Sequence, residues 1–276
     1  MFTPRYLALF CALASGSAFA ADGSRLLRQP DISAQHLAFV YGGDIWLSDT
    51  NGANPRQLTS HAASEFAPKF SPDGNWLAFS AAYDNNTDVY VMPVSGGAAT
   101  RLTFHPGADT VNGWSPDGSK VLFASNREIA NSRSNQLYQV AVSGGYEQKL
   151  MPAVAFEGEL SADGKKLAYR PNNLAYSGSS GWRLHRGGST PPIWILDLEK
   201  QQLEKVPQPN ANNLNPFWLN NEVYFLSDRD NQAVNLFRYR NQQVEQLTTL
   251  RDWDIRSAAG FDNQVVYEAG GYLYQL

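Results

Sequence analysis

The sequence predicts an all-β protein, a six-bladed β-propeller of four-stranded antiparallel blades whose last blade is incomplete. Three observations lead to this prediction. One apolar triplet recurs six times, at intervals of 40, 44, 46, 56 and 42 residues. Turns rich in Asp, Asn and Gly separate it from neighbouring alternating runs, and no helical periodicity extends beyond the first twenty residues. Four short strands in about 40 residues are typical of a propeller blade.

The first twenty residues are predicted to be a secretory signal peptide. Arg5 precedes an apolar run over Tyr6–Leu13, and Ala18-Phe19-Ala20 provides a small-residue cleavage site. We therefore expect cleavage after Ala20, which leaves a β-propeller over residues 21–276. No apolar stretch reaches the roughly 20 residues that cross a bilayer. We expect the mature chain to be periplasmic or otherwise exported, with no membrane span.

Each repeat is centred on the apolar triplet, which we expect to form a buried strand. A short strand precedes it, as in Phe66–Phe70, and an alternating run follows it, as in Val89–Val91. A short outer strand, such as Arg56–Thr59, completes the blade. The six triplets are Leu37–Phe39, Leu77–Phe79, Val121–Phe123, Leu167–Tyr169, Val223–Phe225 and Val265–Tyr267.

Near-identical tight turns precede three of the triplets. Pro presets the entry to a turn, and the Asp-Gly pair accepts a positive φ, so each of these sequences indicates a hairpin. The fifth and sixth repeats use Asn220-Asn221 and Asp262-Asn263 at the same place. The three related turns are Ser71-Pro72-Asp73-Gly74, Ser115-Pro116-Asp117-Gly118 and Ser161-Ala162-Asp163-Gly164.

A single blade exposes both of its apolar faces, so we expect the blades to close into a ring. The sixth copy stops at Leu276, just after its third strand. We therefore expect the natural protein to continue, and this chain to be a fragment of a longer multi-domain protein. Only the fourth copy carries a large insertion, Pro171–Pro192.

The composition argues against several classes of function. There are 22 Lys and Arg against 26 Asp and Glu, a net charge of −4, whereas nucleic-acid binders usually carry a basic excess. The one cysteine, Cys11, lies in the predicted leader, which excludes a disulfide framework and a cysteine metal cage. The four His residues are scattered, and no catalytic or phosphate-binding motif occurs. We expect no catalytic residue, no metal and no cofactor.

The inserted loop of the fourth repeat is the best candidate for contact with a ligand, because long inserted loops are often functional. It carries Trp182, Arg183 and Arg186. Two guanidinium groups beside an aromatic ring could bind the C-terminal carboxylate of a peptide. The alternative is structural: Trp182 anchors the loop, and the two arginines pair with nearby acidic residues. Both interpretations stay open at this point.

Several motifs, taken in order, resemble those of one known family. A single turn of this kind is weak evidence, but the ordered set is specific and covers essentially all of the mature chain. The segments that carry the resemblance are Ser71–Ser80, Tyr83–Val91, Arg101–Asp109, Gly181–Gly188, Ile193–Ile195, Val223–Asp230 and Asn235–Leu236. Together these motifs resemble the N-terminal six-bladed propeller of the tricorn protease family, which has WD40-like repeats.

The resemblance implies a function by association. Members of that family are large serine peptidases with a catalytic domain of the tail-specific type, and they trim oligopeptides. The propeller would act as a gated passage or docking surface, with oligopeptides, the missing C-terminal domains and a hexameric assembly as partners. The catalytic residues belong to those other domains, so this chain should be inactive alone. The family's basic pair between the second and third blades has no counterpart in Pro106–Thr110.

An alternative of another class is a free-standing periplasmic propeller resembling TolB, which binds protein partners and performs no chemistry. TolB-like proteins carry a small α/β domain before the propeller, whereas the first repeat here begins almost at the cleavage site. A third possibility is the propeller of a prolyl-oligopeptidase-type enzyme, which needs a hydrolase domain after the propeller. The reading frame beyond Leu276 would discriminate between these interpretations.

Overall fold

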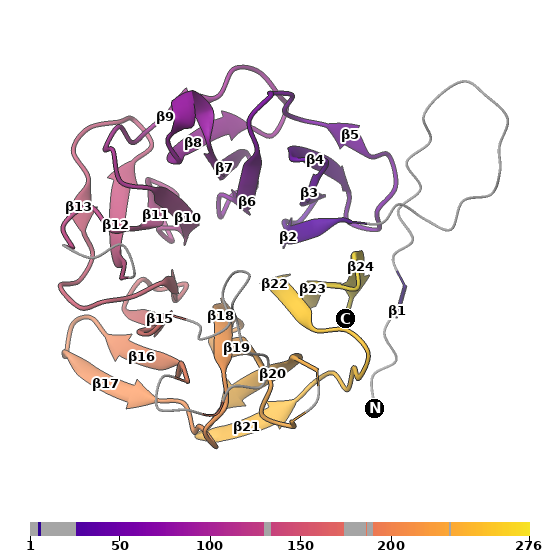
Figure 1. Cartoon of the computed structure of the whole chain (residues 1–276), viewed down its shortest axis with the longest axis vertical. Helices are drawn as coiled ribbons and strands as arrows, with labels where there is room; N and C mark the ends of the chain where they lie inside the picture. The colour runs from indigo at the N-terminus through magenta and orange to yellow at the C-terminus, as the bar shows by residue number, and fades with distance from the viewer. Residues whose placement is uncertain (1–4, 7–25, 130–133, 174–185, 187–189, 232) are drawn as a thin grey trace, which may run out of the picture.

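A computed structural model describes residues 5–6, 26–129, 134–173, 186, 190–231 and 233–276. Six sheets surround a central axis, and in each the first strand of the repeat lies next to that axis (Figure 1). The chain passes through the sheets in sequence order, so we number them blades 1 to 6. The predicted six-bladed β-propeller is confirmed. No helix in the described part of the chain is long and apolar enough to cross a bilayer.

Blades 1 to 3 are antiparallel meanders of four strands each. A 3-10 turn, η1 (Tyr83–Asn85), lies between the second and third strands of blade 2. From the axis outwards the strands are β2 (Arg28–Ile32), β3 (His36–Tyr41), β4 (Asp44–Asp49) and β5 (Arg56–Gln57); β6 (Glu65–Phe70), β7 (Trp76–Ala81), β8 (Asp88–Pro93) and β9 (Thr100–Arg101); β10 (Asp109–Trp114), β11 (Lys120–Ser125), β12 (Gln136–Ala141) and β13 (Gln148–Lys149).

Blades 4 and 5 repeat this arrangement, but residues 26–276 supply only three strands to blade 6. The fourth strand of that sheet is the two-residue β1 (Arg5–Tyr6), which pairs with β24 and falls inside the predicted leader. The prediction of an incomplete last blade is confirmed. The strands are β14 (Glu157–Leu160), β15 (Lys166–Arg170), β16 (Trp194–Asp197) and β17 (Gln202–Lys205); β18 (Asn213–Leu219), β19 (Glu222–Ser227), β20 (Asn235–Arg240) and β21 (Gln243–Gln246); β22 (Ile255–Phe261), β23 (Gln264–Ala269) and β24 (Tyr272–Gln275).

The six apolar triplets form the second strand of every blade, as predicted. Phe39, Phe79, Phe123 and Phe225 within these strands are fully buried. These second strands are apolar on both sides because the neighbouring blades cover both faces of each blade. In the described residues the core divides into six clusters, each spanning two adjacent blades. The propeller core is therefore a ring of sheet-to-sheet interfaces.

Apart from the two-residue β1, the ring closes between blades 1 and 6 by packing of side chains, since within residues 26–276 each of these blades uses its own contiguous segment. Leu37 and Phe39 of blade 1 belong to one apolar cluster with Val266 and Leu273 of blade 6. The Leu27 N–H donates a hydrogen bond of 3.1 Å to the Gly271 carbonyl. This seam depends on that cluster, because no strand of residues 26–276 is exchanged between the two blades.

The predicted Asp-Gly hairpins are confirmed, and they contact one another around one end of the ring. In the first, the Ser71 hydroxyl donates to Asp73 at 2.5 Å and accepts the Trp76 N–H at 2.9 Å. A β-carbon built on Gly118, which has a φ of 69°, would lie 3.7 Å from Pro72 of the preceding blade. The small glycine thus lets neighbouring turns pack closely.

Candidate functional site

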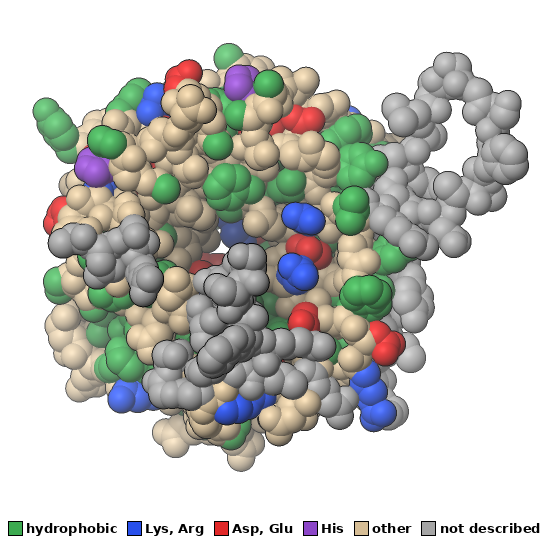
Figure 2. Space-filling model, viewed as in Figure 1, with side chains coloured by type: hydrophobic (Ala, Val, Ile, Leu, Met, Phe, Trp, Pro, Cys, Tyr) green, Lys and Arg blue, Asp and Glu red, His purple; other side chains and the backbone are tan. Residues whose placement is uncertain are grey.

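Two cavities lie along the propeller axis, of about 520 and 310 Å³. Residues from all six inner strands line each of them. Lys69 and Glu159 line both cavities, so the two chambers meet at these side chains. We call Asp31, Lys69 and Glu159 the waist of the channel. Figure 2 shows the central hollow on one face, with acidic and basic side chains in and beside it.

Irregular inner strands direct polar groups toward the axis. The pairing of β6 with β7 shifts between Phe66 and Lys69, and that of β18 with β19 shifts between Leu214 and Phe217. At such a bulge the extra residue leaves the ladder and the regular alternation of side chains breaks. Ala67 in β6 accordingly has a φ of 52°. Backbone N–H groups at these places are free to bond across to the next blade.

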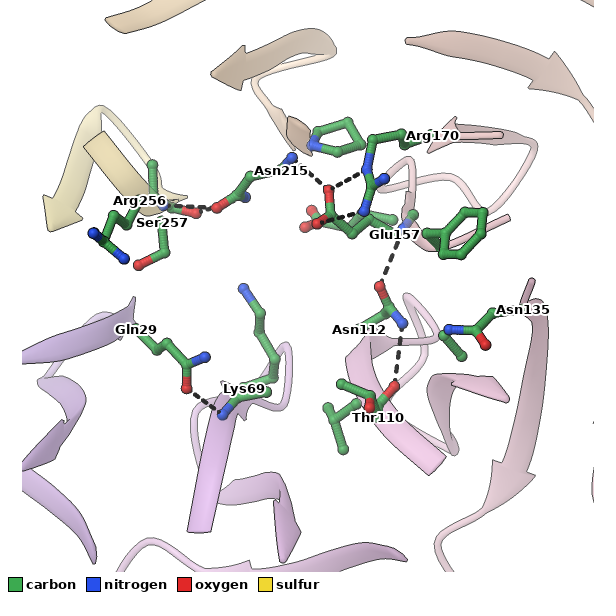
Figure 3. A pocket seen from close by; sticks show the side chains of 18 of the residues that line it. Gln29, Lys69, Thr110, Asn112, Asn135, Glu157, Arg170, Asn215, Arg256 and Ser257 are labelled. Carbon is green, nitrogen blue, oxygen red and sulfur yellow. Dashed lines mark hydrogen bonds and ion pairs between the residues drawn. The ribbon is translucent and has the colours of Figure 1, made fainter. Parts of the chain in front are cut away.

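Polar side chains of the larger cavity accept hydrogen bonds from backbone N–H groups of the inner strands, at bulges and at regularly paired positions (Figure 3). These contacts join blades 1 and 2, 3 and 4, 4 and 5, and 5 and 6, so the polar lining also holds the ring together. They are Ala67 N–H to Gln29 Oε1 at 2.9 Å, Gly158 N–H to Asn112 Oδ1 at 3.2 Å, Asn215 N–H to Glu157 Oε2 at 2.6 Å, and Ala258 N–H to Asn215 Oδ1 at 2.8 Å.

The larger cavity contains one bidentate ion pair and, besides Lys69, a further cation, Arg256. Arg170 donates to both carboxylate oxygens of Glu157, each at 3.1 Å. Burial opposes ionisation of Glu157, but Arg170 and the Asn215 N–H outweigh it and lower the pKa of that carboxyl. Arg256 is exposed at the cavity and, among the described residues, has no carboxylate at ion-pairing distance. The cavity can therefore offer charges of both signs to a ligand.

The waist combines one ammonium group with two carboxylates. The Lys69 Nζ lies 3.1 Å from Asp31 Oδ1, and Asp31 Oδ2 accepts the Phe70 N–H at 2.8 Å. Glu159 Oε1 accepts the Trp218 N–H at 3.2 Å. Burial raises the pKa of Glu159 to about 7, although Lys69 and the Trp218 N–H lower it. Burial also opposes the charge of Lys69, but Asp31 and Glu159 raise its pKa above the ordinary value.

The raised pKa of Glu159 predicts a pH-dependent stability. The folded value of about 7 exceeds the ordinary 4.5, so folding favours the protonated form. This contribution is complete below pH 4.5 and is lost as the pH rises through 7. We expect Glu159→Gln to raise the free energy of unfolding by about 1–3 kcal/mol at pH 8 and to leave it nearly unchanged at pH 4.5. Urea unfolding at both pH values measures this, and equal effects at the two would contradict it.

The smaller cavity opens among the repeated hairpins. Its lining includes residues of the hairpins of three blades: Ser71 and Pro72 of blade 2, Pro116 of blade 3 and Ser161 of blade 4. Hydrogen bonds from Ser115 and Ser119 lower the pKa of Asp117 in one of these turns to about 2. The motif that marked the repeat in the sequence thus also builds the rim at this end of the channel.

The predicted site residues of the inserted loop have different outcomes. Trp182 and Arg183 lie outside the described residues. Arg186 forms an ion pair of 2.9 Å with Asp228, whose carboxylate is buried, and it also donates to Asn231 at 2.9 Å. This is the acidic contact that the structural interpretation expected. Contact of the loop with a peptide stays a prediction.

The sequence patterns did not point to the charged residues of the channel. Asp31, Lys69, Glu157 and Glu159 stand in short inner strands, and Arg170 ends the apolar strand β15. One signal in the sequence could have found them: a charged residue within the first strand of a blade, which faces the axis of a propeller. Within the described residues no cluster of three or more His, Asp, Glu or Cys side chains could hold a metal ion.

Comparisons with known proteins identify relatives of this ring. Residues 24–276 match the family described as tricorn protease N-terminal beta propeller domain. The chain is 25% identical over 249 residues to a tricorn protease homolog of Saccharolobus solfataricus, covering 89% of this chain and 23% of that protein. A crystal structure of the tricorn protease superposes with a TM-score of 0.80 at 22% identity, over 91% of this chain and 25% of that one.

A second kind of propeller shares the fold. The structure of a putative TolB from Agrobacterium tumefaciens superposes with a TM-score of 0.66 at 16% identity, over 91% of this chain and 90% of that one. By contrast, the chain spans about a quarter of the length of the tricorn relatives that it matches.

Proposed function

Because the chain belongs to the family of tricorn protease N-terminal β-propeller domains, we propose that it is the non-catalytic propeller of an exported, tricorn-like serine peptidase that trims oligopeptides. Its task is to admit or dock peptides through the central channel. In this proposal other domains of the same protein carry the catalytic residues, so the propeller alone is inactive.

One observation carries the proposal: two cavities meet on the axis, and every blade contributes to both. The larger one, of about 520 Å³, has the size of small-molecule sites. Its lining offers amide side chains, the exposed Arg256 and a carboxylate, which match the peptide groups and charged termini of an oligopeptide. An extended peptide could also lie along the axis and touch all six blades.

The cellular setting and assembly are part of the same proposal. Export rests on the predicted leader with cleavage after Ala20, and the likeness in fold to TolB structures is consistent with it. A hexameric assembly and docking of the propeller onto C-terminal domains are proposed from the family relationship.

The experiment blocks the channel after folding. In a Cys11→Ser background, Ser257→Cys places the only thiol in the larger cavity, and a bulky maleimide is then attached to the folded protein. Short Ala-Gly peptides are titrated by calorimetry. We expect labelling to weaken their binding by at least about tenfold.

The matched control is Lys200→Cys, at an exposed turn of blade 4, labelled in the same way. It should bind peptides as the unlabelled protein does. Peptide binding that survives the label in the cavity would show that the channel is not the docking site.

A second candidate function is that of a free-standing propeller that binds protein partners, which the likeness in fold to TolB favours. This alternative predicts that short peptides do not bind, and that the maleimide label at position 257 does not change the binding of a protein partner. Sequencing of the reading frame beyond Leu276 provides an independent test. A serine peptidase domain there supports the first proposal, and a stop codon supports the second.

A further inference from the structure

The channel narrows where the two cavities meet, and the charges at that place are unequal. Asp31 and Glu159 carry carboxylates, whereas Lys69 is the single cation of the waist. Asp31 is committed to Lys69 at 3.1 Å and to the Phe70 N–H. The ammonium group of Lys69 is thereby largely neutralised, and Glu159 is left as the surplus charge.

Glu159 has a carboxylate oxygen available for a ligand. Its Oε1 accepts the Trp218 N–H at 3.2 Å, and among the described residues no group donates a hydrogen bond to Oε2. The side chain lines both cavities and is not fully buried, so anything that passes along the axis meets it. A carboxylate oxygen in this position is an acceptor for an ammonium or guanidinium group.

Among the described residues, the other inner strands contribute no charged side chain to the smaller cavity, whereas Glu157 and Arg256 lie in the larger one. Blade 3 provides Gly113, and a β-carbon built there would lie 3.9 Å from the Cγ of Glu159. Blade 5 provides Trp218, and blade 6 provides Ala259 and Gly260. Within the described part of the chain, the charged groups that act on Glu159 are therefore Asp31 of blade 1 and Lys69 of blade 2, and Glu157 acts on Lys69 from the larger cavity. The waist carries one net negative charge when all three of its groups are ionised.

We propose that the waist is a cation-selective site, in which Glu159 binds the ammonium or guanidinium group of a peptide's basic side chain and disfavours acidic peptides. This inference rests on the proposed passage of peptides through the channel. Protonation of Glu159 removes the surplus charge, so selection is strong in mildly alkaline solution and weak in acid.

The test uses three capped peptides of one length, acetyl-Ala-Xaa-Ala-amide with Lys, Gln or Glu at the centre, titrated by calorimetry into the protein at pH 8 and pH 5.5. The caps remove the terminal charges, so the peptides differ only in the central side chain. At pH 8 we expect the Lys peptide to bind about three- to tenfold more tightly than the Gln peptide, and the Glu peptide to bind more weakly than either.

Two variants separate the waist from the overall charge of the protein. Glu159→Gln should abolish the preference at pH 8, as pH 5.5 should nearly abolish it in the unmodified protein. Glu199→Gln makes the same change in net charge at an exposed turn of the same blade, and should keep the preference.

The outcomes distinguish this inference from the function on which it rests. If all three peptides bind equally, or if Glu159→Gln retains the preference, charge selection at the waist is wrong while peptide docking stands. If neither these capped peptides nor the uncapped Ala-Gly peptides bind, the proposed docking function fails and the selection fails with it. If only the uncapped peptides bind, docking stands and the selection of basic side chains is wrong.

Discussion

Replacing Phe39 with alanine should open the seam between blades 1 and 6. Phe39 is fully buried in the cluster that contains Val266 and Leu273 of blade 6. Truncation of a buried phenylalanine leaves a cavity, and we expect the free energy of unfolding to fall by about 3–5 kcal/mol in urea denaturation. Amide hydrogen exchange should accelerate in β2 and β3 and in β22 to β24.

The matched control is Phe123→Ala, at the interface of blades 2 and 3. Phe123 is equally buried, so its loss in stability should be similar. A short chain segment connects blades 2 and 3, whereas within residues 26–276 no short segment of the chain connects blades 1 and 6. When the contact between blades 1 and 6 opens, these blades therefore gain more conformational entropy than blades 2 and 3 would gain. If exchange in β23 is no faster in Phe39→Ala than in Phe123→Ala, the seam is not the weak point of the ring.

Replacing Arg170 with methionine should destabilise the channel wall strongly and in a pH-dependent way. Arg170 is buried and holds Glu157 through two hydrogen bonds of 3.1 Å. Without it the carboxylate keeps its burial but loses its main partner. We expect a loss of about 2–4 kcal/mol at pH 8, below the usual 3–5 kcal/mol for a fully buried pair because Glu157 partly faces the channel.

The pH dependence follows from the reversal of the pKa shift. In the unmodified protein the pKa of Glu157 is lowered, so its contribution is present above its unfolded pKa and is lost in acid. In Arg170→Met burial should raise that pKa, and the deficit should shrink from pH 8 to pH 5. The double variant Glu157→Gln/Arg170→Met should recover most of the loss.

The control for this experiment is Arg240→Met, which breaks an exposed ion pair with Glu222 at 3.4 Å. Surface pairs contribute at most about 1 kcal/mol, so little change is expected. Urea denaturation of all four proteins at both pH values provides the measurement. A cost for Arg170→Met no larger than that for Arg240→Met would show that the Glu157 pair does not support the wall.

The fold was predictable because its signals are local and repeated. Each triplet such as Val121–Phe123 forms the second strand of its blade, and turns such as Ser115-Pro116-Asp117-Gly118 form the hairpins. These patterns arise from strand alternation and from the backbone preferences of Pro, Asp and Gly, which operate within a few residues. The incomplete sixth blade was likewise visible as a repeat that ends after three strands.

The candidate site was not predictable in the same way. The inserted loop drew attention to Arg186, and that side chain is engaged by Asp228. The channel residues Lys69 and Glu159 are 90 positions apart in the sequence and belong to blades 2 and 4. Nothing in either segment alone shows that they share one narrow place on the axis.

The sequence alone determined the ring: its repeat period, its strands, its hairpins and its family resemblance, since each depends on contacts between near neighbours in the chain. Only the tertiary structure decided which charges meet inside the ring. Register shifts in β2 and β6 lie beside Asp31 and Lys69, whereas Glu159 stands in the regularly paired β14, and closure of six blades brings the three side chains together on the axis. The pKa of Glu159 then depends on burial and on partners from other blades, and no segment of the sequence contains that information.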